Sequence, residues 1–116
     1  MPDYRVNEAG VRHARELIDA GTYDDTTEWS EAAPSTAERN EEIEDAGRDE
    51  WSRWYLAEDT DAGEGTKARF RFPYGDFERV NRAALIHAEQ RARQNDHAEI
   101  AKAAKQLLDH LDAKRG

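Results

Sequence analysis

The stretch DFERVNRAALIHAEQRARQNDHAEIAKAAKQLLDHLDA, residues 76–113, decides the fold of this chain of 116 residues. Apolar residues recur in it at spacings of three and four in two separate runs, one beginning at Phe77 and one at Ile100. This spacing predicts two amphipathic helices. Asp76 and Asp96 stand where N-caps belong. Because few residues separate the runs, the helices must be antiparallel neighbours, and we predict a helical hairpin over residues 76–113.

Residues 51–74 carry the signals of a β-hairpin. Trp51, Trp54 and Tyr55 lie too close together for a helical stripe, and aromatic residues favour strands. Residues 59–65 are rich in Asp and Gly, which indicates a turn. Basic and apolar residues then alternate, which predicts one strand face made of Lys67, Arg69 and Arg71 and another made of Ala68, Phe70 and Phe72. A hairpin alone is marginal in water, so we expect it to pack on helices.

Residues 1–50 form an acidic half with two helical signals. Asn7 is a good N-cap, apolar residues recur from Val11 onward, and Gly21 stands at a C′ position. Ser35 followed three residues later by Glu38 has the form of a capping box and predicts a second helix. We therefore expect a single α+β domain over 1–116, mostly helical. In it the β-hairpin (51–74) packs against the helical hairpin (76–113), joined by one or two N-terminal helices (1–50).

Charge is divided unevenly along the chain, whose formal net charge is −9. Residues 1–65 hold six basic and nineteen acidic residues, a net of −13, and residues 66–116 hold eleven basic and seven acidic residues, a net of +4. Either the two halves fold against each other, or an acidic surface faces a solvent of high ionic strength. Thirteen of the seventeen basic residues are Arg, and few Lys beside many acids is typical of salt-adapted proteins.

Several chemistries lack their motifs. There is no Cys, which excludes disulfides, thiolate nucleophiles and Cys-based zinc sites. The histidines form no H-E-x-x-H pattern and are expected at the surface, and the serines have no G-x-S-x-G context. The turn with Asp59, Asp61 and Glu64 lacks the register of a calcium loop. We expect a non-enzymatic protein without metal or cofactor, with no membrane span and no secretory signal.

The candidate binding surface is basic. It consists of the strand face of Lys67, Arg69 and Arg71 with the neighbouring Arg79 and Arg82. A protein partner is favoured, because a chain of net charge −9 is a poor general ligand for nucleic-acid backbones. Two alternatives stay open: a nucleic-acid-binding module that uses the same basic and aromatic strand, and an enzyme whose site only the fold assembles.

Asn81 and Arg91 interrupt the apolar face of the first hairpin helix. A buried Asn or Arg is costly unless it is paired. Asn81 could cap local backbone while Arg91 reaches an acid such as Glu58 or Asp76. Alternatively, Asn81 and Arg91 mark a recognition groove between the hairpin and the sheet, so they belong to the candidate binding residues.

The segment Phe72-Pro73-Tyr74-Gly75-Asp76, followed by Arg79-Val80-Asn81-Arg82 and Ala83-Ala84-Leu85, resembles a family of small uncharacterised proteins of haloarchaea and other prokaryotes. Related segments occur in proteins from prophage-like regions. The resemblance spans about residues 51–112 and implies a compact α+β domain, in agreement with the salt-adapted composition. It carries no catalytic residues. It implies a virion or morphogenesis component of a mobile element, located in the cytoplasm or within a virion assembled there.

Overall fold

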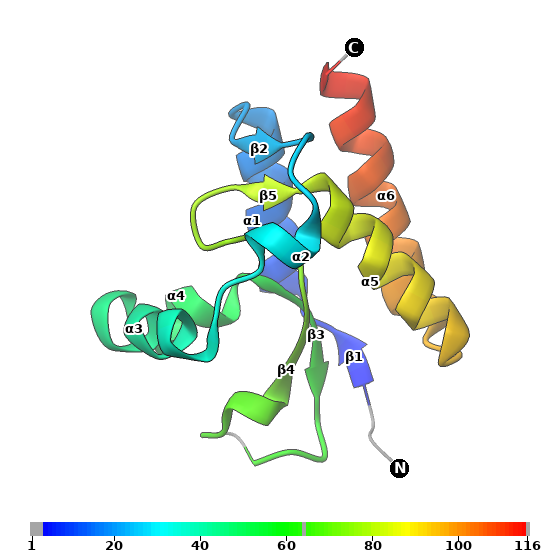
Figure 1. Cartoon of the computed structure of the whole chain (residues 1–116). Helices are drawn as coiled ribbons and strands as arrows, with labels where there is room; N and C mark the ends of the chain where they lie inside the picture. The colour runs from blue at the N-terminus through cyan, green and yellow to red at the C-terminus, as the bar shows by residue number, and fades with distance from the viewer. Residues whose placement is uncertain (1–3, 64, 116) are drawn as a thin grey trace.

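The computed structural model describes residues 4–63 and 65–115. It is a mostly helical α+β fold with a small sheet and a C-terminal helix pair, which confirms the predicted class (Figure 1). In chain order the elements are β1 (Tyr4–Val6), α1 (Glu8–Asp19), β2 (Tyr23–Asp24), α2 (Trp29–Ala32), α3 (Thr36–Ala46), α4 (Arg48–Ser52), β3 (Tyr55–Asp59), the 3-10 helix η1 (Lys67–Arg69), β4 (Phe70–Pro73), β5 (Val80–Asn81), α5 (Arg82–Gln94) and α6 (Ala98–Arg115).

Three antiparallel strands form the main sheet in the order β1-β3-β4. Their register places Arg5 opposite Glu58 and Glu58 opposite Phe70, so these three side chains share one face of the sheet. Figure 1 shows the sheet at the bottom, with α3 and α4 to its left and α5 and α6 to its right. A second pair, β2 and β5, is parallel and only two residues long in each strand.

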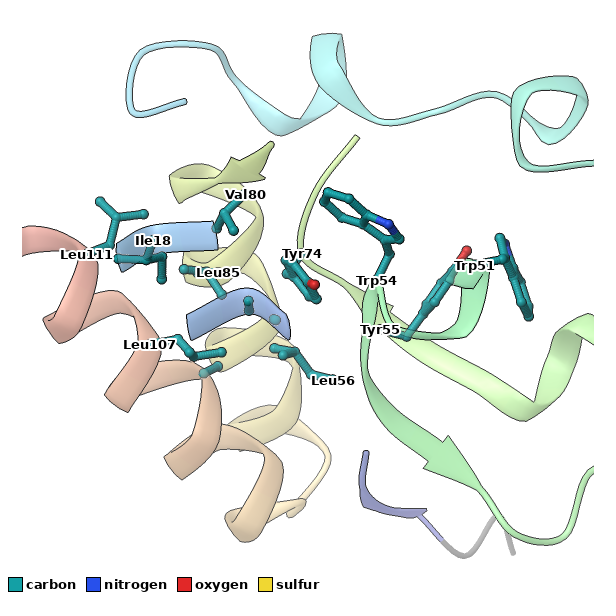
Figure 2. Packing of buried hydrophobic residues seen from close by; sticks show 13 residues of the cluster. Ile18, Trp51, Trp54, Tyr55, Leu56, Tyr74, Val80, Leu85, Leu107 and Leu111 are labelled. Carbon is teal, nitrogen blue, oxygen red and sulfur yellow. The ribbon is translucent and has the colours of Figure 1, made fainter. Parts of the chain in front are cut away.

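The core lies where the helical hairpin meets α1 and the sheet. Leu85 of α5 and Leu107 and Leu111 of α6 are fully buried, and Ile18 of α1 packs in the same cluster (Figure 2). Each such side chain contributes about 1.5–3 kcal/mol to folding. Trp51, Trp54, Tyr55 and Tyr74 extend the cluster toward the sheet. The aromatic residues thus enlarge a core that is short of aliphatic residues.

Gly10 allows α1 to lie directly against β3. A Cβ atom at this position would stand 2.0 Å from the carbonyl oxygen of Tyr55 and 3.0 Å from Nδ2 of Asn7. Asn7 precedes α1 but its side chain does not cap the helix; Nδ2 donates instead to the carbonyl oxygens of Ser52 and Tyr55. A glycine that is unfavourable for helix formation therefore fits here for a tertiary reason.

The helical hairpin begins later than predicted. Residues 76–79 form a turn, in which Oδ1 of Asp76 accepts hydrogen bonds from the backbone N–H groups of Glu78 and Arg79, and Phe77 has φ +70°. The prediction that Asp76 caps a helix containing Phe77 is therefore wrong. The apolar spacing misled because Phe77 packs on the core from this turn. The helix starts at Arg82, and Oδ1 of Asn81 accepts from the N–H of Ala84 as its N-cap.

The β-hairpin is also shorter than predicted. Trp51 lies in α4, and the first strand starts at Tyr55. Residues 67–69 form a 3-10 turn, in which the N–H of Arg69 donates to the carbonyl oxygen of Thr66 and the N–H of Phe70 donates to that of Lys67. Ala68 is consequently exposed, so the predicted strand face made of Lys67, Arg69 and Arg71 does not exist.

Candidate binding site

Three arginines from separate parts of the chain line one cavity of about 320 Å³, on the face of the sheet that carries Glu58 and Phe70. Arg5 comes from β1, Arg48 from α4 and Arg69 from η1. The other residues that line the cavity are Asp49, Ser52, Glu58 and Phe70. We call these seven residues the arginine pocket.

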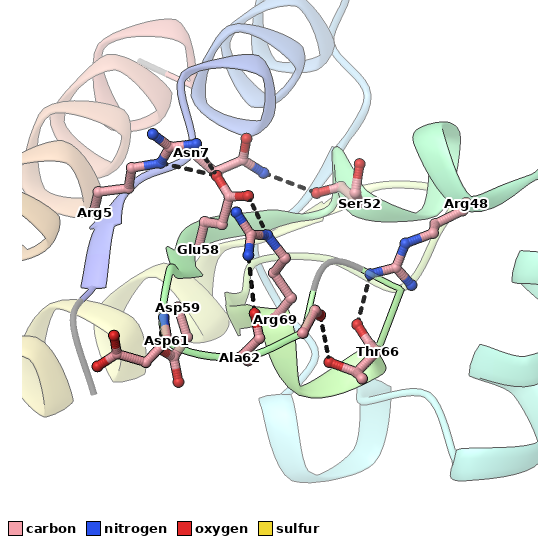
Figure 3. Close-up of polar contacts among 11 residues, drawn as sticks. Arg5, Asn7, Arg48, Ser52, Glu58, Asp59, Asp61, Ala62, Thr66 and Arg69 are labelled. Atoms are coloured by element: carbon pink, nitrogen blue, oxygen red, sulfur yellow. Dashed lines mark hydrogen bonds and ion pairs between the residues drawn. The ribbon is translucent and has the colours of Figure 1, made fainter. Parts of the chain in front are cut away.

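Glu58 lies between two of the arginines (Figure 3). Its Oε1 accepts from Nε of Arg5 at 3.0 Å and from Nη2 of Arg5 at 2.8 Å, and its Oε2 accepts from Nε of Arg69 at 2.6 Å. Nη1 of Arg69 donates to the carbonyl oxygen of Ala62 at 2.9 Å. The side chains of Arg69 and Glu58 are only 13% and 14% exposed, whereas Arg5 is 63% exposed. Arg69 is therefore fixed in place, and Arg5 reaches the solvent.

The two guanidinium groups keep Glu58 ionised. Burial raises the pKa of this carboxyl group, but the hydrogen bonds from Arg5 and Arg69 outweigh burial and hold the pKa below its usual value. A carboxylate that is ionised and clamped in this way neutralises much of the charge of its two partners. The pocket therefore already contains one carboxylate, that of Glu58, which two guanidinium groups bind.

Arg48 forms the opposite wall of the pocket against two aromatic rings. Its guanidinium carbon lies 5.3 Å from the ring centre of Trp51 and 5.5 Å from that of Phe70, within the range of cation–π attraction. Nη2 of Arg48 also donates to the carbonyl oxygen of Thr66 at 2.6 Å. The rings and this hydrogen bond set the position of the third positive charge.

The pocket is positive on a chain that is strongly negative. Among the described residues that line it, three arginines stand against Asp49 and Glu58, a formal charge of +1, whereas the whole chain carries −9. Guanidinium groups bind carboxylates and phosphates through paired N–H donors. The arrangement can therefore attract and orient an anion.

The structure disperses the predicted binding residues. Of these, only Arg69 lines the pocket; Lys67 is exposed and contacts Asn40, and Arg71 is exposed on β4. Arg82 makes two hydrogen bonds to Asp112, at 2.8 and 3.1 Å, and so ties the start of α5 to the end of α6.

The remaining three predicted residues fall in different places. Nη2 of Arg79 lies 3.8 Å from the carboxylate of Asp24. Asn81 is 1% exposed and caps α5, so it lines no groove, and the capping interpretation of this residue is confirmed. Arg91 is exposed, and neither acid suggested for it is its partner: Glu58 binds Arg5 and Arg69, and Asp76 binds backbone.

Two of the three pocket arginines were not predicted. Arg5 reaches the site because residues 4–6 form an edge strand that pairs with β3, and a three-residue strand leaves no alternation in the sequence to detect. Arg48 lies in α4, a five-residue helix between Gly47 and the first strand. The only sequence signal for Arg48 is Trp51 three residues later, a helical spacing that suits stacking on the ring.

The histidines differ from the expected surface positions. Only His87 of the four is exposed. Nδ1 of His13 lies 2.9 Å from the hydroxyl oxygen of Tyr74, and the O–H of Tyr74 donates to the carbonyl oxygen of Arg53. Burial raises the pKa of Tyr74, and both contacts satisfy its buried hydroxyl group. His97 stacks on Tyr4 at 4.5 Å between ring centres. His13 and His97 therefore serve packing, whereas Nε2 of His110 lies 2.7 Å from Oδ1 of Asp19.

Within residues 4–63 and 65–115, no three His, Asp or Glu side chains form a group that could hold a metal ion. Asp59 accepts from the N–H of Asp61 at 3.0 Å within its turn, and Glu64, the third acid considered there, lies outside the described residues. None of the described helices is long and apolar enough to cross a membrane.

No protein-family model, curated protein or solved structure matches the chain.

Proposed function

We propose that the chain is a non-enzymatic, cytoplasmic protein-binding module whose arginine pocket contacts an acidic segment of a protein partner. The observation that carries this proposal is the convergence of Arg5, Arg48 and Arg69 on one cavity. A chain of net charge −9 repels most acidic surfaces, so a local positive site selects where and how an acidic partner approaches.

The composition of the pocket favours a protein over a nucleic acid. Nucleic-acid affinity comes from neutralising several phosphates in succession, whereas Asp49 and Glu58 reduce the charge of this pocket to +1. Arg82 is already bound to Asp112, and Arg79 lies near Asp24. The basic residues therefore make no continuous track along which a phosphate backbone could run.

Site-specific photo-crosslinking tests the proposal. A benzoylphenylalanine replaces Ser52, which lines the pocket, and in a control protein it replaces Gln90 on the exposed side of α5. Both tagged proteins are expressed in the host at its native salt, irradiated, and purified with and without nuclease. We expect one protein to be cross-linked in near-stoichiometric amount from position 52 only, whether or not nuclease is present.

Two variants that each remove one positive charge provide the test and its matched control. Arg5→Gln should reduce the cross-link at least fivefold, and Arg12→Gln, the same change at an exposed position of α1, should leave it unchanged. A cross-link that disappears with nuclease favours the nucleic-acid alternative. Equal cross-linking from positions 52 and 90 would contradict the proposal.

A further inference from the structure

The helical hairpin carries a second surface feature, a groove that is separate from the arginine pocket. The groove has a volume of about 380 Å³, and one residue of α5 and five of α6 line it: Arg93, Ala98, Ala101, Lys102, Lys105 and Gln106. None of the described residues lines both sites. We propose that this α5–α6 groove binds helix α3 of a second copy of the chain, so that copies associate head to tail.

The α5–α6 groove combines basic groups with small apolar ones. Among the described residues that line it, three are basic and none is acidic. Ala98 and Ala101 contribute only methyl groups, and the exposed Lys102 and Lys105 add long methylene stems that end in ammonium groups. The groove therefore suits a helix that presents carboxylates together with small apolar residues.

The basic groups of the groove are weakly paired inside the molecule. Nη2 of Arg93 lies 2.8 Å from Oε1 of Glu89, and Nζ of Lys105 donates to Oδ1 of Asp109 at 2.6 Å. Such i,i+4 pairs contribute only about 0.3–0.5 kcal/mol each. Within residues 4–63 and 65–115, Lys102 makes no hydrogen bond and no ion pair. An approaching carboxylate therefore finds one unpaired ammonium group beside two that exchange partners at little cost.

Helix α3 carries the complementary charge, with five acidic residues and one basic residue. Glu41, Glu44 and Asp45 are exposed, and none of the three is paired with a basic group in the described part of the chain. Burial raises the pKa of Glu42, and the carboxylates of Asp45 and Glu50 raise it further. The acids on and beside α3 thus repel one another, and a basic surface that approaches them relieves this repulsion.

The charges of the two surfaces have the same spacing. Glu41 and Glu44 are three residues apart on α3, and Lys102 and Lys105 are three residues apart on α6. Residues at i and i+3 lie on one side of a helix, about 4.5 Å apart along its axis, so each lysine can face one glutamate when the two helices lie side by side. Ala37, four residues before Glu41, adds a methyl group on the same side of α3.

The contact must join two copies of the chain. Figure 1 shows α3 on one side of the molecule and α5 with α6 on the other, so α3 cannot fill the groove of its own molecule. Each copy then supplies a different surface to each neighbour, which makes the interface heterologous. The net charge of −9 on each copy opposes association. At about 0.15 M salt, however, the Debye length is only about 8 Å, so the charges that face each other across the contact dominate.

Sedimentation equilibrium of the full-length protein at pH 7 in about 0.15 M KCl tests the inference. We expect the weight-average mass to rise above that of one chain between about 10 µM and about 1 mM protein, the range that suits an interface of exposed charges. Lys102→Glu together with Lys105→Glu should weaken association at least tenfold. Arg12→Glu together with Arg15→Glu changes the net charge equally at exposed positions of α1 and should leave association unchanged.

Exchange of the charges between the two surfaces separates a lost contact from a damaged fold. Glu41→Lys together with Glu44→Lys should also weaken association at least tenfold, because α3 then meets a groove of like charge. The protein that combines these changes with the two groove substitutions has its native net charge but reversed signs on both surfaces. We expect it to associate as strongly as the native protein, within a factor of about two.

Three results would overturn the inference. They are a native protein that stays monomeric over this range, association that survives reversal of either surface, and a charge-exchanged protein that does not associate. None of them affects the proposed function, because the arginine pocket takes no part in the contact. In the cross-linking experiment, a second copy joined from position 90 is distinguished from a partner by its mass, since the product has twice the mass of the tagged chain.

Discussion

At the scale of single residues, tertiary contacts override local preference. Gly10 and Asn81 each occupy a position that their sequence neighbours alone do not explain. Gly10 meets the carbonyl oxygen of Tyr55, and Asn81 donates from Nδ2 to the carbonyl oxygen of Thr27. The sequence marked Asn81 as unusual because it interrupts an apolar face, whereas nothing near Gly10 reveals β3, which lies 45 residues further along.

Gly10→Ala should destabilise the protein. Helix propensity alone predicts a gain of about 1 kcal/mol, but the new Cβ would clash with backbone at 2.0 Å, and overpacking of this kind costs about 1–3 kcal/mol. Urea unfolding measures the free energy. Gly65→Ala is the control, because no heavy atom lies within 4 Å of a Cβ there. A stabilised Gly10→Ala would contradict the packing of α1 on β3.

Asp24 should make stability dependent on pH in acid. Hydrogen bonds from Thr26 and Thr27 lower the pKa of Asp24 to about 2, although burial opposes them. Because the folded pKa lies below the unfolded value of 3.8, the stabilisation is complete above pH 4 and is lost as the pH falls toward 2. It amounts to about 2 kcal/mol. Asp24→Asn should flatten the unfolding free energy over that interval, and an unchanged slope would contradict this assignment.

At the scale of elements, long periodic segments were predictable and short ones were not. The predicted C-terminal helix pair is confirmed as α5 and α6, although its first helix starts at Arg82 and not at residue 76, since 13 and 18 residues give several turns of apolar spacing. The capping box of Ser35 and Glu38 is present at the start of α3. Strands β1, β2 and β5 have two or three residues, and their pairing is decided by partners far away in the chain. The pocket depends on β1, so most of it could not be predicted.

Loss of the N-cap at the junction of β5 with α5 should lower the free energy of unfolding more than loss of the N-cap at an exposed helix start. Asn81 accepts from the N–H of Ala84 and donates from Nδ2 to the carbonyl oxygen of Thr27 at 3.0 Å. Asn81→Ala removes the cap and leaves buried polar groups unpaired, so we expect a loss of about 2–4 kcal/mol. Ser35→Ala, at the exposed cap of α3, should lose only about 1 kcal/mol. Equal losses in thermal unfolding would contradict the structural role of Asn81.

At the scale of the whole molecule, net charge governs the response to salt. The chain carries −9, and many ion pairs, such as that of Arg82 with Asp112, are partly exposed and contribute little. Self-repulsion among the acids then dominates the electrostatic free energy and is screened as salt increases. The resemblance to a haloarchaeal family stays a prediction that agrees with this charge, and the mobile-element origin that it implies also stays a prediction.

The urea midpoint should rise between about 0.1 M and 1 M KCl, as the Debye length falls from about 10 Å to about 3 Å. Replacement of Glu41 and Glu44, exposed acids of α3, by Gln should reduce this dependence. Replacement of Arg12 and Arg15, exposed bases of α1, by Gln should increase it. A midpoint that falls with KCl would show that attractive ion pairs, and not net repulsion, control the stability.

The pairing of β1 with β3 has a consequence for the order in which the fold can form. Arg5 pairs with a residue 53 positions later, and β1 also contacts α6, which begins at Ala98. During synthesis β1 therefore cannot pair or pack until β3 and α6 have been translated. The loop that it closes is long, and contacts of such sequence separation slow folding. The arginine pocket, which spans β1, α4 and η1, is thus among the last parts of the molecule to be assembled, so a newly made chain should become competent to bind only when folding is nearly complete.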